Sequence, residues 1–550
     1  DGGFNHESEE GSRAPELEER VEAALDAAAA TVPRLLQVYV GPPEAGAVAD
    51  NVLRAGLNAV DAFIGPAEEA ALRAALFPDR EVFADPTLNH VRLTMVLAPL
   101  IPRGEPVRTE LDVPRTGRSS DARLLWQLPA KGRVQARLLV LHRNRVIQTA
   151  LLSGRVGGAA RVTERLVLWE ALNHLDERQP FDRTFVLNHD DDGAAAVVSH
   201  ADGATTIEAM DEVDATTERI RTYLLKATQL TASGRAAEEA ARKILIDVAV
   251  EGNDLYVTLE AHLARFAEAR RIQIVTARTG RFLPLELVYD RPAPDEDATM
   301  CANWVAGSQC GPHCFADADD TSVVCPSVFW GMNRVIERHH APLTAAGGTA
   351  FLLTATPTRK QRTLTITHAA LAASAKVRPV DVGRTAEALG AGTTRVATWK
   401  EWAAALAATP TDLLVLMPHT DPAEHSLEIA GSKPTLRSGR IEARHVTGGK
   451  DVHPVVVLFG CDTAGSKDDP AGYATRFMAK GAAVVFSTLT MLLGRHAAAM
   501  SEQLATALLA EGRTEQPLGQ VVATFRRDAL RAGLISALAV TAYGDADWKV

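Results

Sequence analysis

The chain has 550 residues, of which 46% are hydrophobic and 23% charged, and its formal net charge at pH 7 is −11. This length exceeds what one hydrophobic core supports, so several domains are expected. The acidic balance argues against a general nucleic-acid or anionic-membrane binder, because Lys and Arg supply most phosphate affinity, and no apolar run approaches the ~20 residues that cross a bilayer.

Cysteine content and the start of the chain bear on its compartment. Five cysteines are far fewer than a disulfide scaffold carries, and an odd number leaves at least one thiol unpaired. The first residues are rich in Gly, Glu and Ser and lack the basic and then apolar pattern of a secretory signal. The sequence begins with Asp1 rather than Met, which indicates a trimmed chain. Together these features predict a cytoplasmic protein.

The N-terminal part of the chain is expected to be rich in strands. Residues 1–30 are acidic and then rich in Ala, which predicts a tail or a single helix. From residue 31 to 202, short apolar or alternating runs are broken by Gly, Pro and Asn, which predicts an antiparallel β-sandwich-like domain for sensing or partner binding. Its clearest element is a hairpin that pairs 134–141 with 146–152. We expect the polar tip, His142–Arg145, to be a solvated turn.

An acidic turn and a helical connector come next. The segment Asn188–Gly193 is rich in Asp but lacks the spacing of a calcium loop, so a surface turn is the expected structure. Residues 203–271 carry helical patterns in which apolar residues recur every three or four positions. The expected helices are 216–232, 235–250 and 254–270.

Residues 272–550 alternate between strand and helix patterns. This alternation predicts βαβ crossovers, and therefore an α/β domain with a mostly parallel sheet covered by helices on both faces. The expected strands are 272–276, 349–354, 412–417, 454–459, 482–487 and 538–543, and the expected helices are 399–408, 470–480, 495–510 and 518–532. The predicted fold class is thus multidomain, with a β-sandwich-like domain, a helical connector and a C-terminal α/β domain.

Four of the five cysteines crowd into an insertion at residues 295–330. Thiolates are good zinc ligands, and a closed tetrahedral site would hold together a segment that has little core of its own. The usual pairs of cysteines two residues apart are absent, so unligated thiols and disulfides stay open as alternatives. The candidate ligands of a structural zinc ion are Cys301, Cys310, Cys314 and Cys325, with His313 as a substitute for one of them.

A histidine and the fifth cysteine each follow a short, fully apolar run. His419 follows the run ending at Met417, and Cys461 follows the run ending at Phe459. Parallel sheets present ligand and catalytic groups at the carboxyl ends of their strands, so we expect both side chains at one edge of the sheet. A thiolate at Cys461 would be the nucleophile, His419 its acid and base, and the backbone N–H of Gly460 a donor to a developing oxyanion. The alternative is a buried structural cysteine and an unrelated loop histidine.

In this part of the chain the sequence resembles a known family. Residues 272–550 look like a CHAT domain of a bacterial type, which is a caspase-like cysteine peptidase module of clan CD. The resemblance implies peptide-bond hydrolysis by the His419/Cys461 dyad without a catalytic cofactor, and a role in bacterial defence, including antiviral defence, or in regulated cell death. The segments that carry it are His419 in its turn after a strand, Val455–Gly465, the helix with Ala474, Phe477 and Met478, Gly481–Ser487, Ala542–Asp545, Phe282–Asp290 and Cys325–Gly331.

The sequence departs from the family at one position and leaves its specificity open. CHAT peptidases usually carry Gly directly after the catalytic His, where its backbone helps to form the oxyanion hole, and Thr420 stands there instead. Peptidases of this clan that cut after basic residues tend to place an acid two residues before the Cys, and that position is Phe459. This argues against specificity for Arg or Lys. Asp421 and Asp462 lie near enough in sequence to line a substrate pocket, and their charge would then favour a basic residue instead.

Two classes of function fit these patterns. The first is a cysteine endopeptidase that cuts a protein encoded by a neighbouring gene. The second is a catalytically silent caspase-like scaffold that signals by assembly, which Thr420 would favour. A Gly-x-Ser-x-Gly elbow, a phosphate-binding Gly-rich loop and a dinucleotide fingerprint are all absent from the sequence, so other α/β enzymes have little support.

Overall fold

The computed structural model describes residues 33–44, 48–77, 79–83, 85–167, 178–189, 195–201, 204–209, 211–229, 235–277, 282–340, 363–421, 426–431, 435–460, 472–510 and 516–549. The expected tail or helix at 1–30, the expected strand at 349–354 and residues 190–193 of the acidic turn lie outside these ranges. Among the described helices, none combines the length and the apolar character that crossing a membrane requires.

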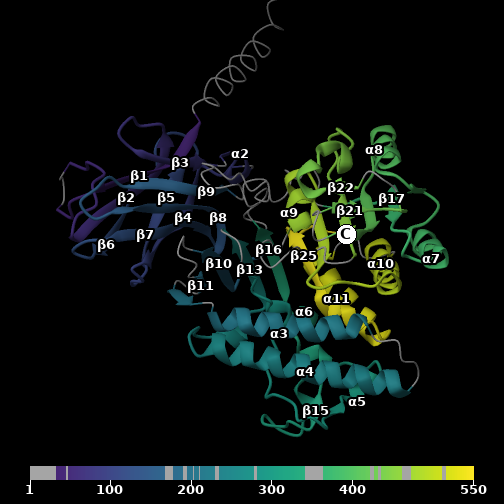
Figure 1. The fold of residues 1–550 in the computed structure, drawn as a ribbon. Coiled ribbons are helices and arrows are strands. Elements are labelled where there is room, and N and C mark those ends of the chain that lie inside the picture. Colours follow the sequence, from purple (N-terminus) through teal and green to yellow (C-terminus); the bar gives the residue numbers. More distant parts are fainter. Residues whose placement is uncertain are drawn as a thin grey trace, which may run out of the picture.

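The N-terminal part is a sandwich of two antiparallel sheets (Figure 1). One sheet has the order β3-β1-β2-β6 and the other β5-β4-β7-β8-β9. Alternate residues of each strand face a shared core. In β6, for example, Leu124 and Trp126 are buried, whereas Arg123 and Leu125, which precede each of them, are exposed. The elements are β1 Arg34–Gly41, β2 Gly56–Pro66, β3 Leu72–Leu76, α2 Asp79–Val82, β4 His90–Ile101, β5 Val107–Pro114, β6 Ala122–Leu128, β7 Arg133–His142, β8 Arg145–Arg155 and β9 Arg161–Val167.

The rest of the chain is built on one eleven-stranded sheet of order β12-β11-β10-β13-β16-β25-β24-β23-β19-β17-β18. Its pairs are parallel from β10 to β16 and from β24 to β18, and antiparallel at β12-β11-β10 and on both sides of β25. The expected α/β architecture with a mostly parallel sheet is therefore present. The strands are β10 Arg183–His189, β11 Ala195–Ala201, β12 Ala204–Ala209, β13 Arg271–Thr276, β16 Val335–His340, β17 Ala369–Ala373, β18 Thr393–Arg395, β19 Leu413–Met417, β23 Val455–Leu458, β24 Val484–Thr488 and β25 Val540–Gly544.

Helices cover both faces of the half of this sheet that contains β17, β19, β23 and β24. Alternate residues of each strand face opposite sides, so Leu413 and Val415 pack against α7, α10 and α11, whereas Leu414 and Leu416 pack against α8 and α9. The helices are α7 Pro379–Leu389, α8 Trp399–Ala408, α9 Gly472–Ala479, α10 Gly494–Leu509 and α11 Leu518–Arg531.

The other half of the large sheet lies between the sandwich and a pair of long helices. Phe185 and Ile272 face α4, while Val186 and Val275 face the five-stranded sheet of the sandwich. The long helices are α3 Asp211–Thr228 and α4 Arg235–Glu260. Figure 1 shows α3 and α4 side by side beneath the strands.

Two boundaries differ from those expected at 31–202 and 203–271. Residues 183–189 and 195–201 form β10 and β11, which belong to the large sheet rather than to the sandwich, and residues 204–209 form β12 of that same sheet. Within the described residues the connector contains two α-helices instead of three, because 235–250 and 254–260 form the single helix α4, which ends at Glu260.

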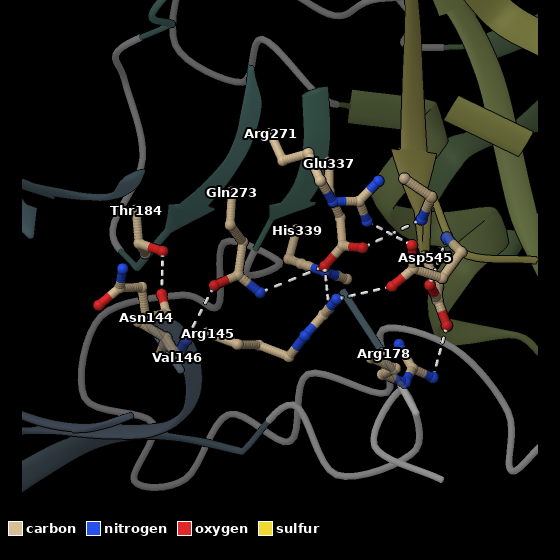
Figure 2. Close-up of polar contacts among 12 residues, drawn as sticks. Asn144, Arg145, Val146, Arg178, Thr184, Arg271, Gln273, Glu337, His339 and Asp545 are labelled. Carbon is tan, nitrogen blue, oxygen red and sulfur yellow. Dashed lines mark hydrogen bonds and ion pairs between the residues drawn. The ribbon is translucent and has the colours of Figure 1, made fainter. Parts of the chain in front are cut away.

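The two halves of the large sheet meet at β16 and β25, where the backbone contributes little. Their only described register pair is Arg338 with Gly544. Side chains supply the rest of the junction: the Ala546 N–H donates to Glu337 Oε2 over 3.0 Å, and Arg271 pairs with Asp547. Figure 2 shows this buried network.

The tip of the β7–β8 hairpin reaches into the same junction, so the expectation of a solvated turn is wrong. Arg145 is fully buried and donates to Glu337 Oε1 over 2.7 Å and to Asp547 Oδ2 over 3.0 Å (Figure 2). The Val146 N–H donates to Gln273 Oε1 over 2.8 Å. The sandwich is therefore bound to both halves of the large sheet through one hairpin.

Candidate active site

The edge at which β17, β19 and β23 end carries the candidate catalytic residues. β19 is apolar and buried along its whole length, and the chain leaves it through buried Pro418 into His419, the first residue of β20. β23 leaves the sheet in the same direction through Phe459 and Gly460, since β19 and β23 are parallel. The Phe459 N–H donates to the Leu416 oxygen over 3.0 Å, which extends the pairing to the point where both chains turn.

Gly460 is required at this edge by close packing. A Cβ at position 460 would overlap the Pro418 carbonyl oxygen, so only glycine lets the two strand ends approach this closely. His419 and Gly460 line one small pocket, whose remaining wall is largely apolar and includes Met417, Phe459 and Leu492. Two of the predicted site residues, His419 and Gly460, are thus brought together. Cys461, which directly follows Gly460, lies outside the described residues, as does Asp462.

Thr420 and Asp421 lie in a small antiparallel sheet that leads away from the pocket. Its strands are β20 His419–Asp421, β21 Ser426–Glu428 and β22 Leu436–Arg437. In the register Thr420 lies opposite Leu427, and the residue is only 3% exposed. Thr420 is therefore a buried strand residue. Asp421 lies opposite Ser426 at the end of the pair.

A lysine beside His419 was not expected from the sequence. Lys376 lies after β17, and its Nζ is 2.7 Å from His419 Nε2. An ammonium group only donates, so in this arrangement Nε2 is the acceptor and the neutral imidazole carries its proton on Nδ1. Lys376 also lines the pocket and, with His419 neutral, is its only charged side chain among the described residues. Nε2 of His419 can accept a proton from a thiol only after its hydrogen bond with Lys376 Nζ is broken.

The loop that carries Lys376 is fixed by neighbouring strands. The Ser374 N–H donates to the Met417 oxygen over 2.8 Å, and Ser374 Oγ donates to Glu428 Oε2 over 2.8 Å. Glu428 is the register partner of His419, so one carboxylate connects the loop after β17 to the strand that faces the histidine. Lys376 could not be predicted as a neighbour of His419, because β17 was not predicted as a strand and its pairing with β19 was therefore unknown.

The four clustered cysteines form a second site, well separated from the first along the chain. Cys301 and Cys325 each follow one of two short parallel strands, β14 Thr299–Met300 and β15 Val323–Val324. The Sγ atoms of Cys301, Cys310, Cys314 and Cys325 all lie within 4.8 Å of one another, and none of these thiols is disulfide-bonded. Four cysteines this close together suit a structural metal ion. His313 is exposed, and its Nε2 lies 3.2 Å from the Gln309 oxygen, so the alternative ligand is not part of the cluster.

The thiols of this cluster differ in their acidity. Burial and nearby sulfur raise the pKa of Cys325, and burial raises the pKa of Cys310 to about 11. Burial also acts on Cys314, but hydrogen bonds from Asn303 Nδ2 and the Gly311 N–H outweigh it and lower the pKa of that thiol to about 7. The residues therefore offer one readily ionised thiolate and three sulfurs within reach of the same ion.

The insertion with these cysteines is fastened to the C-terminal helices. Arg531 is the last residue of α11 and donates to the Ser308 oxygen over 3.1 Å. Its guanidinium group also stacks on the ring of Trp304, which lies in the short helix α5 Ala302–Val305. Buried Cys301 and Cys325 belong to the same core cluster as Ile244 of α4. A metal ion here would hold together a segment that lies between two groups of helices.

Comparisons with known proteins give limited similarity. No protein-family model matches the sequence, and no curated protein matches it. Among solved structures, the complex of Porphyromonas gingivalis RgpB pro- and mature domains matches with a TM-score of 0.32 and 11% identity, over 60% of this chain and 77% of that chain. The Arg-specific cysteine proteinase gingipain R matches with a TM-score of 0.30 and 12% identity, over 60% and 75%.

Saccharomyces cerevisiae separase in its complex with securin matches with a TM-score of 0.33 and 11% identity, over 66% of this chain and 30% of that chain. The chain therefore spans less than a third of the separase chain. At these TM-scores and identities, the comparisons assign no activity to this chain.

Proposed function

We propose that this chain is a cysteine endopeptidase of the caspase-like CHAT type, which cuts a partner protein through a His419/Cys461 dyad. The observation that carries the proposal is the convergence of His419 and Gly460, the residue before Cys461, on one pocket at the carboxyl edge of parallel strands. The resemblance of the segments around His419 and Cys461 to CHAT domains agrees with this proposal, while no family model matches the sequence. No catalytic cofactor is required.

The reaction has two covalent steps. The Cys461 thiolate attacks the carbonyl carbon of the scissile peptide bond, while backbone N–H groups such as those of Gly460 and Thr420 stabilise the oxyanion. His419 gives the thiol proton to the leaving amine as the C–N bond breaks and a thioester forms. Water then attacks the thioester, loses its proton to His419, and releases the acid and the thiol.

The setting we propose is bacterial defence or regulated cell death, in the cytoplasm, with a substrate encoded by a neighbouring gene. The N-terminal sandwich would receive the activating partner or effector. Its buried contact with both halves of the large sheet supports this role, because a change in the sandwich reaches the catalytic half through the β7–β8 hairpin.

The test is cleavage of candidate partners by the purified full chain. Incubation with the proteins encoded beside its gene should yield at least one defined cut, and Cys461→Ala and His419→Ala should each slow it by about three orders of magnitude or more. His368→Ala is the matched control, because His368 is exposed and directly precedes β17 at the opposite end of that strand. Cleavage that survives Cys461→Ala would disprove the mechanism.

A silent scaffold is the competing function, favoured by Thr420 where an active family member carries Gly and by the Lys376 contact that occupies His419 Nε2. A peptide carrying a thiol-reactive electrophile separates the two. A peptidase should be labelled at Cys461 in a His419-dependent manner, whereas a scaffold should show equal labelling with and without His419.

We also propose that the four cysteines hold a structural zinc ion. Zn–S bonds of ~2.3 Å in a tetrahedron place sulfurs about 3.8 Å apart, so a modest closing of the present cluster suffices. Reduced protein purified without chelators should contain about one equivalent of zinc, and Cys301→Ser with Cys325→Ser should abolish it. Less than about half an equivalent in the unaltered chain would count against the proposal.

A further inference from the structure

The outer face of the five-stranded sheet, which points away from the sandwich core, is only partly covered. Leu139 and Leu141 of β7 pack against β10, β11 and β13, and Arg137 Nε donates to Asn188 Oδ1 of β10 over 2.6 Å. Beyond Arg137, toward the start of β7, the same face opens into a pocket of about 520 Å³. This pocket therefore borders the contact between the sandwich and the large sheet.

The walls of this pocket combine basic and polar side chains with Leu151, Ala159 and two glycines. β7 contributes Arg133 and Gln135, β8 contributes Ser153 and Arg155, and β9 contributes Arg161 and Thr163. These side chains share one face, since Arg133 pairs with Arg155 in the register, and Ser153 pairs with both Gln135 and Arg161. No carboxylate lines the pocket within the described residues.

Such a concentration of positive charge is unexpected for a packing surface. The chain as a whole carries a net charge of −11, so a group of arginines on one face stands out. Arg155 and Arg161 are exposed, and neither forms an ion pair in the part of the chain that the structure describes. A bound anion would supply these two guanidinium groups with a partner.

We propose that the pocket binds a small anionic effector that carries two or more phosphate groups, such as a nucleotide. Arg155 and Arg161 are the residues on which the assignment rests, because guanidinium groups bind phosphate oxygens in a bidentate manner. Ser153, Thr163 and Gln135 add hydrogen-bonding groups for a sugar or a base. The volume lies in the range of small-molecule sites, whereas a nucleic-acid strand requires an extended groove.

The pocket also has a direct physical connection to the junction of the large sheet. Arg133 and Arg155 are at the open end of the β7–β8 hairpin, and Arg145 is at its closed end, buried against Glu337 and Asp547. A ligand that bridges β7, β8 and β9 would thus act on the element that joins the sandwich to both halves of the sheet. This inference concerns binding and stands whether or not the chain is a peptidase.

Calorimetric titration of the full chain with adenosine triphosphate, and separately with inorganic tripolyphosphate, tests the proposal. We expect saturable binding of one equivalent of at least one of them, weakened by added salt, with affinity reduced roughly tenfold or more by the double variant Arg155→Gln/Arg161→Gln. Arg108→Gln, an exposed arginine of β5 outside the pocket, should leave the affinity unchanged. Circular dichroism and thermal unfolding of each variant verify that it is folded.

Four results would overturn the proposal. The first is the absence of saturable binding at millimolar ligand, and the second is equal affinity in the double variant. The third is binding that appears only when Asp190, Asp191 and Asp192 are all changed to Asn, because the acidic turn of the chain would then be the natural counter-ion of the pocket. Binding of a single-stranded oligonucleotide without binding of either small ligand would likewise replace the proposal by a nucleic-acid site.

Discussion

Lys376 is the residue whose charge most directly affects the candidate active site. Its ammonium group contacts the neutral imidazole of His419 and is the only charge among the described residues of the pocket. A substrate with Arg or Lys next to the scissile bond would bring a second cation into this pocket. The lysine thus supports the expectation, drawn from Phe459, that the peptidase does not cut after basic residues.

Charge reversal at this position should change the preference. We expect Lys376→Glu to raise kcat/KM for a peptide with Arg before the cut, relative to the matching Ala peptide, by about tenfold, the size of one added ion pair in a partly buried site. Lys480→Glu, an exposed change at the end of α9, is the control. An unchanged ratio would show that Lys376 lies outside the substrate-binding region.

His445 makes stability depend on pH. This histidine is buried beneath Trp399, and its backbone oxygen accepts a hydrogen bond from Trp402 Nε1 over 2.9 Å. Burial, and secondarily the charge of Arg444, lowers the pKa of His445 below its usual value of about 6.5. Below that pH the unfolded chain binds a proton that the folded chain still excludes, so the free energy of unfolding should fall as pH falls from 6.5 through the folded-state pKa.

The corresponding variant is His445→Asn, whose side-chain oxygen can replace Nδ1 as the acceptor for the Glu442 N–H. Urea unfolding at pH values about one unit above and one unit below 6.5 should show a smaller loss of stability in His445→Asn than in the unaltered chain. The exposed His368→Asn should lose as much stability as the unaltered chain. Identical losses in all three proteins would rule out His445 as the titrating group.

At the scale of elements, the β7–β8 hairpin carries the largest expected effect of a single substitution. Burial disfavours the charged form of Glu337, but Arg145 and His339 outweigh it and hold the pKa of this carboxyl well below its usual range. Arg145→Met would leave Glu337 buried without its principal cation. Loss of one partner of a buried ion pair typically costs about 3–5 kcal/mol.

Urea unfolding of Arg145→Met should show a loss of that size, and Arg108→Met on the exposed side of β5 should change stability by no more than about 0.5 kcal/mol. Adding Glu337→Met to Arg145→Met should recover part of the loss, since no buried charge then lacks a partner. If both single variants behave alike, the ion pair does not hold the hairpin in place.

The sequence predicted the bounds of individual strands and helices better than the contacts that bury them. The two strands of the hairpin were expected within a few residues of β7 and β8, and α8 has the expected bounds. The burial of the tip could not be predicted, because the partners of Arg145 lie 192 and 402 residues away in the chain. β16 was not predicted for the same reason: Glu337, Arg338 and His339 do not form an apolar run, yet each is buried with a distant or opposite charge.

A glycine explains why one long helix was expected to be two. Gly252 lies inside α4, where glycine usually weakens a helix, and the pattern therefore predicted an end near residue 250. A Cβ there would overlap the Leu287 carbonyl oxygen, so the glycine serves close packing between α4 and the segment around Tyr289. Position 252 is thus a contact point, and the helix continues through it.

At the scale of the candidate site, the sequence predicted the edge of the sheet but not its chemistry. The two apolar runs that precede His419 and Cys461 were sufficient to predict that both strands end at the same edge of the sheet. Thr420 could be named as a departure but not interpreted, because its burial depends on pairing with β21. Lys376 could not be found at all, since its contact with His419 depends on the pairing of β17 with β19.

At the scale of the whole molecule, the cysteine-rich insertion links the long helices to the catalytic half. If zinc is bound, its removal should loosen this link without unfolding either sheet. We expect a chelator to lower the thermal midpoint of the reduced protein by several degrees, about 2–4 °C for each kcal/mol lost in a domain of some 200 residues. Re-addition of zinc should restore the midpoint, and Cys301→Ser with Cys325→Ser should make it insensitive to the chelator.

The position of β25 has a consequence for the making of the protein. Within the described residues, this strand alone lies between β16 and β24, and it follows both in the chain. The two halves can therefore become one sheet only once β25 has been made, although α11 already contacts the first half through Arg526 and the Gly331 oxygen. Pairing through β25 comes after every other strand of the described sheet has been synthesised.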